Sequence, residues 1–88
     1  MTPGSRNYRK KPVVIQAIQY TGSNEAEVRV FMDNRSAMLT HTPTYLILST
    51  GAGQVQITPG DWIIRGVKNE YYPCRSDLFL ATYEAVTP

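Results

Sequence analysis

The chain has 88 residues, of which 42% are hydrophobic and 18% are charged, and its formal net charge is +2 at pH 7. This length suits one small domain, and this composition excludes an intrinsically disordered protein. The sequence contains neither an apolar run of the roughly 20 residues that span a membrane nor a signal-peptide pattern. Its single cysteine, Cys74, excludes an internal disulfide framework, so we expect a cytoplasmic protein.

Positive charge is concentrated at the start of the chain. Four basic residues precede Pro12, whereas residues 12–88 carry five basic and seven acidic residues. The four are Arg6, Arg9, Lys10 and Lys11. Such an arm either contacts phosphate groups or keeps a flanking strand soluble. Residues 1–7 show no hydrophobic periodicity, so we expect them to form a flexible tail and residues 8–88 to form a single domain.

The first half of the domain predicts a strand followed by a helix. Pro12–Tyr20 carries apolar residues on both of its alternating faces, which indicates a central strand covered on both sides. Ser23 is a preferred N-cap residue, and it predicts a helix that begins there and ends near Asn34. The apolar residues at helical spacing, which we expect to face the sheet, are Val28, Phe31 and Met32.

The second half predicts two β-hairpins. Residues 35–43 form a connection in which Met38 and Leu39 make either a short strand or a flap. Thr44–Thr50 and Gln54–Thr58 flank a glycine-rich turn, and Pro59-Gly60 leads into a second hairpin of Trp62–Val67 and Tyr71-Tyr72. Thr44–Thr50 has no charged residue, so we expect it to be covered by a second copy of the chain or by residues 35–43.

Ser76 is another potential N-cap residue, and the end of the chain predicts a short helix from Ser76 to about Leu80. Ala81–Val86 either continues this helix or forms a final strand, and we expect the strand. The predicted fold class is therefore α+β, a small single domain in which a curved, mostly antiparallel β-sheet carries one main helix. We expect the most buried side chains to be Val13, Ile15, Ile18, Val28, Phe31, Leu46, Leu48, Val55, Ile57, Ile64 and Phe79.

No combination of residues indicates catalysis or metal binding. His41 is the only histidine, and no second ligand lies at metal-binding spacing from it. Cys74 would need a nearby base to act as a nucleophile, and a half-buried structural thiol explains it more simply. Asp61 and Asp77 are explained as a turn residue and a first-turn helix residue. We therefore expect no cofactor and no enzymatic activity.

The second hairpin is the best candidate for a binding surface, because aromatic and basic residues gather on and beside it. Stacked rings and guanidinium groups bind nucleotides, and the same residue types are enriched in protein interfaces. The candidate binding residues are Arg65, Lys68, Tyr71 and Arg75 on the hairpin, with Arg9 and Lys11 reaching it from the first strand. We expect removal of Arg65 and Arg75 to leave the melting temperature nearly unchanged. Alternatively, these charges only protect an edge strand from aggregation.

Two segments resemble a known family. YRKKPVVIQAIQYTG, from Tyr8 to Gly22, and PGDWIIRGVKNEYYPCRSDLFLATYE, from Pro59 to Glu84, are similar to the two ends of small phage-encoded proteins of uncharacterised function. The chain departs from that pattern at Gln16, where an acid is expected, and at Asn69, where glycine is expected. The resemblance implies a phage or prophage origin, and thus the cytoplasm of a bacterial host, and it supplies no catalytic residues.

Three classes of function are compatible with these features. The first is a non-enzymatic phage-type binding protein that counters host defence by sequestering a small nucleotide signal. The second is an inhibitor or adaptor that binds a host or phage protein. A nucleic-acid-binding module that uses the basic arm ranks below both. We expect a homodimer whose partner is a small anionic ligand or a host protein, with no membrane association.

Overall fold

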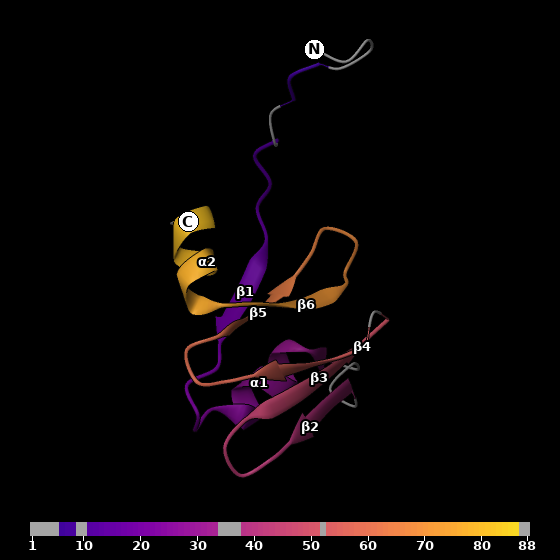
Figure 1. Cartoon of the computed structure of the whole chain (residues 1–88), viewed down its shortest axis with the longest axis vertical. Coiled ribbons are helices and arrows are strands. Elements are labelled where there is room, and N and C mark those ends of the chain that lie inside the picture. Colours follow the sequence, from indigo (N-terminus) through magenta and orange to yellow (C-terminus); the bar gives the residue numbers. More distant parts are fainter. Residues whose placement is uncertain (1–5, 9–10, 34–37, 52, 87–88) are drawn as a thin grey trace.

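The computed structural model describes residues 6–8, 11–33, 38–51 and 53–86, and Figure 1 shows their arrangement. The candidate residue Arg9, the expected helix end at Asn34 and residues 1–5 of the expected tail lie outside these ranges. The elements are β1 (Gln16–Gln19), α1 (Glu25–Phe31), β2 (Leu39–His41), β3 (Leu46–Thr50), β4 (Gly53–Ile57), β5 (Trp62–Arg65), β6 (Tyr71–Cys74) and α2 (Ser76–Thr82).

The strands form two antiparallel sheets of three strands each. Sheet A has the order β1-β5-β6, and sheet B, which lies below it in Figure 1, has the order β2-β3-β4. The predicted α+β class is confirmed, with the antiparallel strands divided between two sheets. Leu39 pairs with Leu48, so β3 is the central strand of sheet B. Of the two expected covers, a second copy or residues 35–43, the structure shows the second, through the pairing of Leu39–His41 with β3.

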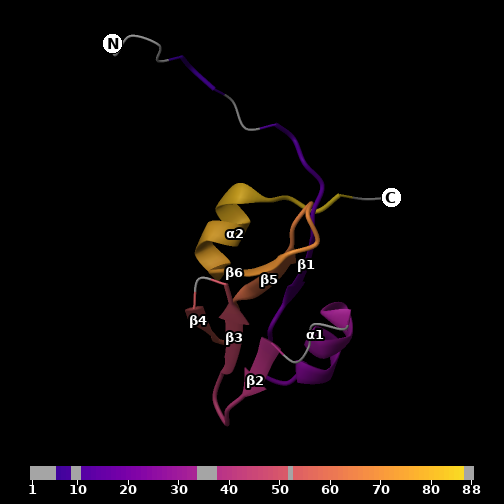
Figure 2. The ribbon, with the colours of Figure 1, turned by 90° about the vertical axis from the view of Figure 1, so that its right-hand side faces the viewer.

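The two helices lie on opposite faces of sheet A, as Figure 2 shows. Successive residues of β5 point to opposite faces, and this alternation assigns each side chain to one helix. Trp62 stacks on Phe79 of α2. Ile63, one residue later, belongs to the core between the sheets, where α1 also packs. Sheet A is therefore covered on both faces, as the apolar residues of its first strand predicted. The expectation that this strand is central was wrong, because β1 lies at an edge of the sheet and β5 is its central strand.

The main core lies between the two sheets and α1. Its buried members are Tyr20, Val28, Met32, Leu39, Leu46, Leu48, Ile57, Ile63 and Tyr71. Five of the expected core residues are buried, namely Val28, Leu46, Leu48, Ile57 and Ile64. Four others are only half-buried, namely Ile15, Ile18, Phe31 and Phe79. Ile64 is buried outside this cluster, on the face of sheet A that α2 covers.

Val13 and Val55 are exceptions to the predicted core. Val13 is 49% exposed because β1 begins only at Gln16, which pairs with Arg65, the last residue of β5. The chain turns away after Arg65, so residues 12–15 continue the line of β1 with no neighbouring strand to pair with. Val55 is 37% exposed because β4 is an edge strand of sheet B. The predictions that Val13 and Val55 are buried were wrong because an alternating hydrophobic pattern does not show where a strand ends or which strand lies at the edge of a sheet.

The N-cap predictions were wrong by one residue at each helix. α1 begins at Glu25 after Asn24, and α2 begins at Ser76 after Arg75. Asn24 instead closes the turn that joins β1 to α1. Its side-chain oxygen accepts from the Thr21 N–H, and its amide donates to the Gln19 carbonyl, each at 2.8 Å. A side chain that satisfies two backbone groups of the turn explains why Asn24, and not Ser23, precedes the helix.

The expected final strand over Ala81–Val86 is absent. Helix α2 continues to Thr82, and Tyr83–Val86 has no regular structure. The Tyr83 N–H donates to the Phe79 carbonyl and its ring lies 5.0 Å from that of Phe79. These contacts direct the chain along the face of sheet A rather than along one of its edges. No helix within the described residues is long and apolar enough to cross a membrane.

Candidate functional site

Arg65, the first of the predicted binding residues, sits on the α1 face of sheet A. Its Nε donates to the Tyr71 hydroxyl and its Nη1 to the Gln16 side chain, both at 2.9 Å. Its Nη2 donates to the Phe31 carbonyl at the end of α1 and to Asp33. The guanidinium carbon also lies 5.0 Å from the centre of the Phe31 ring. The guanidinium therefore joins sheet A to the C-terminal end of α1.

This arrangement corrects the expectation that Arg65 is a surface cation. Its side chain is only 22% exposed, and its donors already have partners within the chain. A carbonyl at a helix C-terminus and a carboxylate both favour a positive charge. Tyr71 is buried beside it, and its ring meets Phe31 edge to face at 5.9 Å. The structure brings Arg65 and Tyr71 together in a contact that stabilises the fold.

The remaining predicted cations do not gather around Arg65. Cys74 pairs with Trp62, and Tyr71 pairs with Arg65, so Arg75 follows the far end of the hairpin, about 10 Å along the strand direction. Arg75 is 77% exposed, with Nε 3.7 Å from the Asp77 carboxylate. Lys68 is exposed in the hairpin loop, and Lys11 lies on the segment before β1. The described cations therefore form no convergent anion site.

The opposite face of sheet A carries an aromatic stack. The rings of Trp62 and Phe79 are nearly parallel, with centres 3.9 Å apart, and Tyr83 continues the row. The Trp62 Nε1 is buried and has no hydrogen-bond acceptor within the described part of the chain. A buried donor without an acceptor costs about 1–3 kcal/mol. This face therefore holds an indole N–H that is closed off from solvent beneath the aromatic surface.

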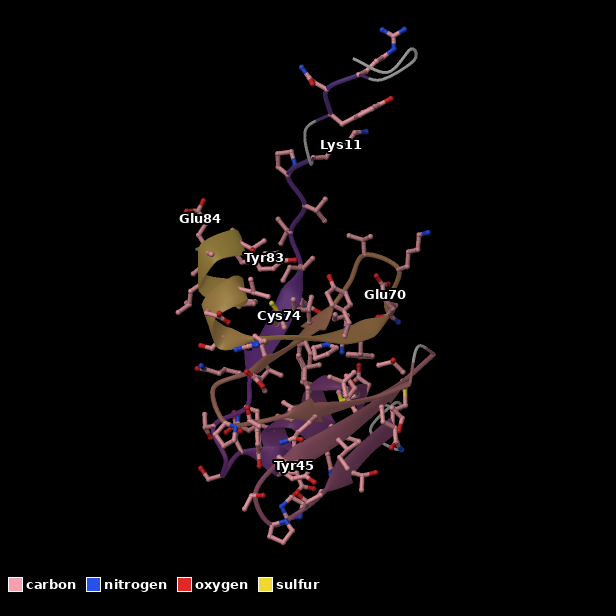
Figure 3. All side chains as sticks on the ribbon, in the orientation of Figure 1. Lys11, Tyr45, Glu70, Cys74, Tyr83 and Glu84 are labelled. Atoms are coloured by element: carbon pink, nitrogen blue, oxygen red, sulfur yellow. The ribbon has the colours of Figure 1, made fainter. Side chains whose placement is uncertain are left out.

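An apolar groove, which we call the α2 groove, lies over this stack. It has a volume of about 590 Å³. Its lining includes Val13, Val14, Trp62, Phe79, Leu80, Tyr83 and Val86. Four of these side chains, Val13, Val14, Leu80 and Val86, are largely exposed. Figure 3 shows Tyr83 between α2 and the segment that precedes β1, with Glu84 at the outer side of the helix.

The groove continues past Tyr83 toward the second hairpin. There it is lined by Val67 and Tyr72, with Lys11, Glu70 and Glu84 among its polar residues. Burial raises the pKa of the Tyr72 hydroxyl, and a hydrogen bond with Tyr83 and its negative neighbour Glu70 raise it further. The hydroxyl is thus neutral at physiological pH, and the carboxylates outnumber the single lysine among these residues.

Cys74 lies on the same face of sheet A and is half-buried. Burial raises the pKa of its thiol, and the nearby carboxylates of Asp77 and Asp61 raise it further. The thiolate is the nucleophilic form of cysteine, so this environment suppresses reactivity. The interpretation of Cys74 as a structural thiol agrees with this geometry.

Sequence reasoning missed the α2 groove, although one signal for it was present. Leu78, Phe79 and Leu80 are three consecutive large apolar residues in a helix of seven. Consecutive helical residues point about 100° apart, so a single contact with the sheet cannot bury all three. Phe79 makes the contact with the sheet, by stacking on Trp62, and Leu80 is exposed at the groove. Val13 and Val14 gave no such signal, because their exposure depends on where β5 ends.

Known proteins supply no assignment for these features. No protein-family model, no curated protein and no solved structure matches the chain. Within the described ranges, no three histidine, cysteine, aspartate or glutamate side chains gather where they could hold a metal ion. The resemblance of Pro59–Glu84 to phage proteins stays a prediction.

Proposed function

We propose that this protein is a non-enzymatic binding protein whose α2 groove holds an extended peptide segment of another protein. The observation that carries the proposal is the exposed apolar groove over an aromatic stack. Monomeric proteins seldom expose contiguous apolar surface of this kind without an interaction that covers it. The resemblance to phage proteins further supports an inhibitor or adaptor of a host or phage factor.

The chemistry of the groove defines the segment it would bind. The apolar walls match large aliphatic or aromatic side chains. Glu70 and Glu84 favour lysine or arginine beside the apolar residues, since opposite charges at an interface rim speed and orient association. We therefore propose an apolar segment flanked by basic residues.

Sequestration of a small nucleotide, the first function expected from the sequence, has less support. A nucleotide needs cations around its phosphates, and among the described residues lining the groove Lys11 is the sole cation. Arg65, the strongest candidate for gripping a phosphate, already binds Phe31 and Asp33. The aromatic stack alone would accommodate a base but not the charge attached to it.

The test uses a displayed random peptide library, selected on the immobilised protein. The key variant is Val14→Glu, which places a charge in the groove. Val30→Glu on α1 is its matched control, because both valines are 74% exposed. We expect enriched peptides that combine apolar and basic residues, lose binding to the Val14→Glu variant and bind the control like the wild type.

Trp62, the only tryptophan, provides a direct readout of the groove. Its fluorescence should shift to shorter wavelength when an enriched peptide covers it, and a panel of cyclic and ADP-ribose-type nucleotides should leave it unchanged. Equal binding of the peptides to wild type and Val14→Glu would overturn the proposal. A fluorescence response to a nucleotide, with no peptide enriched, would overturn it in favour of nucleotide sequestration.

A further inference from the structure

The two sheets present four edge strands, and three of them are protected against pairing with another strand. β1 is preceded by the basic arm, and its Gln19 carbonyl accepts from Asn24. β2 is only three residues long, and its His41 lies 3.5 Å from Glu25 of α1. Short length, flanking charge and covered backbone groups are the usual devices that block edge-to-edge pairing.

The third protected edge is that of β6. The Gly66 N–H donates to the Glu70 carbonyl, and backbone groups alternate in direction along an antiparallel ladder. Tyr72 and Cys74 therefore turn their backbone groups toward β5, while Tyr71 and Pro73 turn theirs outward. Pro73 has no N–H, so the outer edge of β6 lacks one of its donors.

β4 has none of these protections. Its five residues carry no charge and no proline, and Gly53, Gln54, Val55 and Gln56 are exposed. The Gly53 carbonyl accepts from the Thr50 hydroxyl of β3 at 2.9 Å, so the odd-numbered residues of β4 face β3. Gln54 and Gln56 then turn their backbone N–H and carbonyl groups outward. This edge is ready to accept another strand.

We propose that β4 pairs antiparallel with β4 of a second copy, which forms a two-fold symmetric dimer with a continuous sheet of six strands. With the axis at Val55, each outward-facing Gln54 lies opposite Gln56 of the other copy, so four backbone hydrogen bonds form. The two Val55 side chains meet at the axis on the core side, where each is now 37% exposed. A neutral strand suits pairing with itself, because no like charges oppose one another.

The two glutamines provide a test of both the edge and its register, because their exposed side chains can change without disturbing the core. In the double variant Gln54→Lys with Gln56→Lys, two lysine pairs would face each other across the axis. In the variant Gln54→Glu with Gln56→Lys, each pair would instead be a glutamate and a lysine. Circular dichroism and Trp62 fluorescence serve to check that each variant folds.

The measurement is sedimentation equilibrium from micromolar to millimolar concentration. We expect the wild type to approach twice its 9.9 kDa mass, the double-lysine variant to associate at least about tenfold more weakly, and the glutamate–lysine variant to recover association. Mixing the double-lysine variant with a double-glutamate variant should restore dimers as well. A wild type that stays at 9.9 kDa, or a double-lysine variant that associates as well as the wild type, would overturn the proposal.

Discussion

Arg65 has more internal partners than any other cation described above. Its guanidinium binds β1, α1, Asp33 and the Tyr71 hydroxyl at once. The guanidinium group is planar and directs several N–H donors in fixed directions, so a lysine cannot reproduce these contacts. Removing it would leave the Phe31 carbonyl with only the longer hydrogen bond from the Tyr71 hydroxyl, at 3.3 Å, and would take away the donor that Arg65 supplies to that hydroxyl.

We therefore predict that Arg65→Ala lowers the free energy of unfolding by about 2–3 kcal/mol. Arg65→Lys should recover only part of that loss. Urea denaturation followed by Trp62 fluorescence measures both. Arg75→Ala is the control, and we expect a change below about 0.5 kcal/mol because its pair with Asp77 is exposed. Equal effects of the two alanine variants would contradict the structural role of Arg65.

Cys74 predicts a specific pH dependence. Folding raises the pKa of its thiol above the ordinary value of 9.0, so the folded state favours the neutral form. Its contribution to stability is present below pH 9.0 and is lost as the pH rises through the raised pKa. Between these two pH values, wild type should lose more stability than Cys74→Ala in urea titrations. Parallel losses in both proteins would show that the thiol is not responsible.

Alkylation provides a second measurement of the same thiol. The rate of reaction with iodoacetamide follows the thiolate fraction. We expect its midpoint to lie at higher pH in the folded protein than in urea. A lower midpoint in the folded protein would indicate an activated cysteine and would reopen a catalytic role.

Among the secondary-structure elements, the second hairpin shows how local chemistry fixes a strand pair. The Gly66 N–H donates to the Glu70 carbonyl, and the Asn69 N–H donates to the Gly66 carbonyl at 3.0 Å. Asn69 has a φ of 63°, the left-handed conformation that ends a three-residue hairpin loop. Glycine adopts this conformation without strain, which is a physical reason for the glycine that the family resemblance places there.

We predict that Asn69→Gly raises the free energy of unfolding by about 0.5 kcal/mol and that Asn69→Ala lowers it by about 1 kcal/mol. Asparagine tolerates a positive φ better than alanine does, so the native residue should lie between the two. Thermal unfolding of the three proteins gives the order. Alanine at or above the stability of glycine would contradict the hairpin geometry described here.

The elements that the sequence predicted well are those whose signals are local. Asp61 accepts from the Thr58 N–H at 3.1 Å, and Gly60 has a φ of 101°, so the Pro59-Gly60 turn was readable from three residues. The role of Arg65 was not readable, because its partners Phe31 and Asp33 lie more than thirty residues away. The α2 groove was missed for a similar reason, since it depends on where β5 stops.

For the whole molecule, unequal burial of the two faces of sheet A has consequences for dynamics. The core between the sheets holds most of the fully buried side chains, whereas α2 buries none completely. Regions with few buried contacts open without global unfolding.

We predict that backbone amides of Leu48, Ile57 and Ile63 exchange with deuterium on the order of a hundredfold more slowly than those of Phe79 and Leu80. Hydrogen exchange followed by nuclear magnetic resonance measures each site. Phe79→Ala should speed exchange in α2 and leave the other three amides unchanged. Acceleration across all sites would show that the molecule unfolds as a single unit.

The α2 groove also indicates that the chain could be circularly permuted. Lys11–Ile15 and Tyr83–Val86 stand near opposite ends of the sequence but line the same groove. A short glycine–serine linker between these segments, with new termini opened at the exposed Lys68, would give a circular permutant. Every strand of both sheets would keep its present neighbour, because exposed loop tips tolerate such cuts. In that permutant, β6 would be followed by α2 and then, through the linker, by β1. The fold would therefore be kept although the order of its elements along the chain had changed.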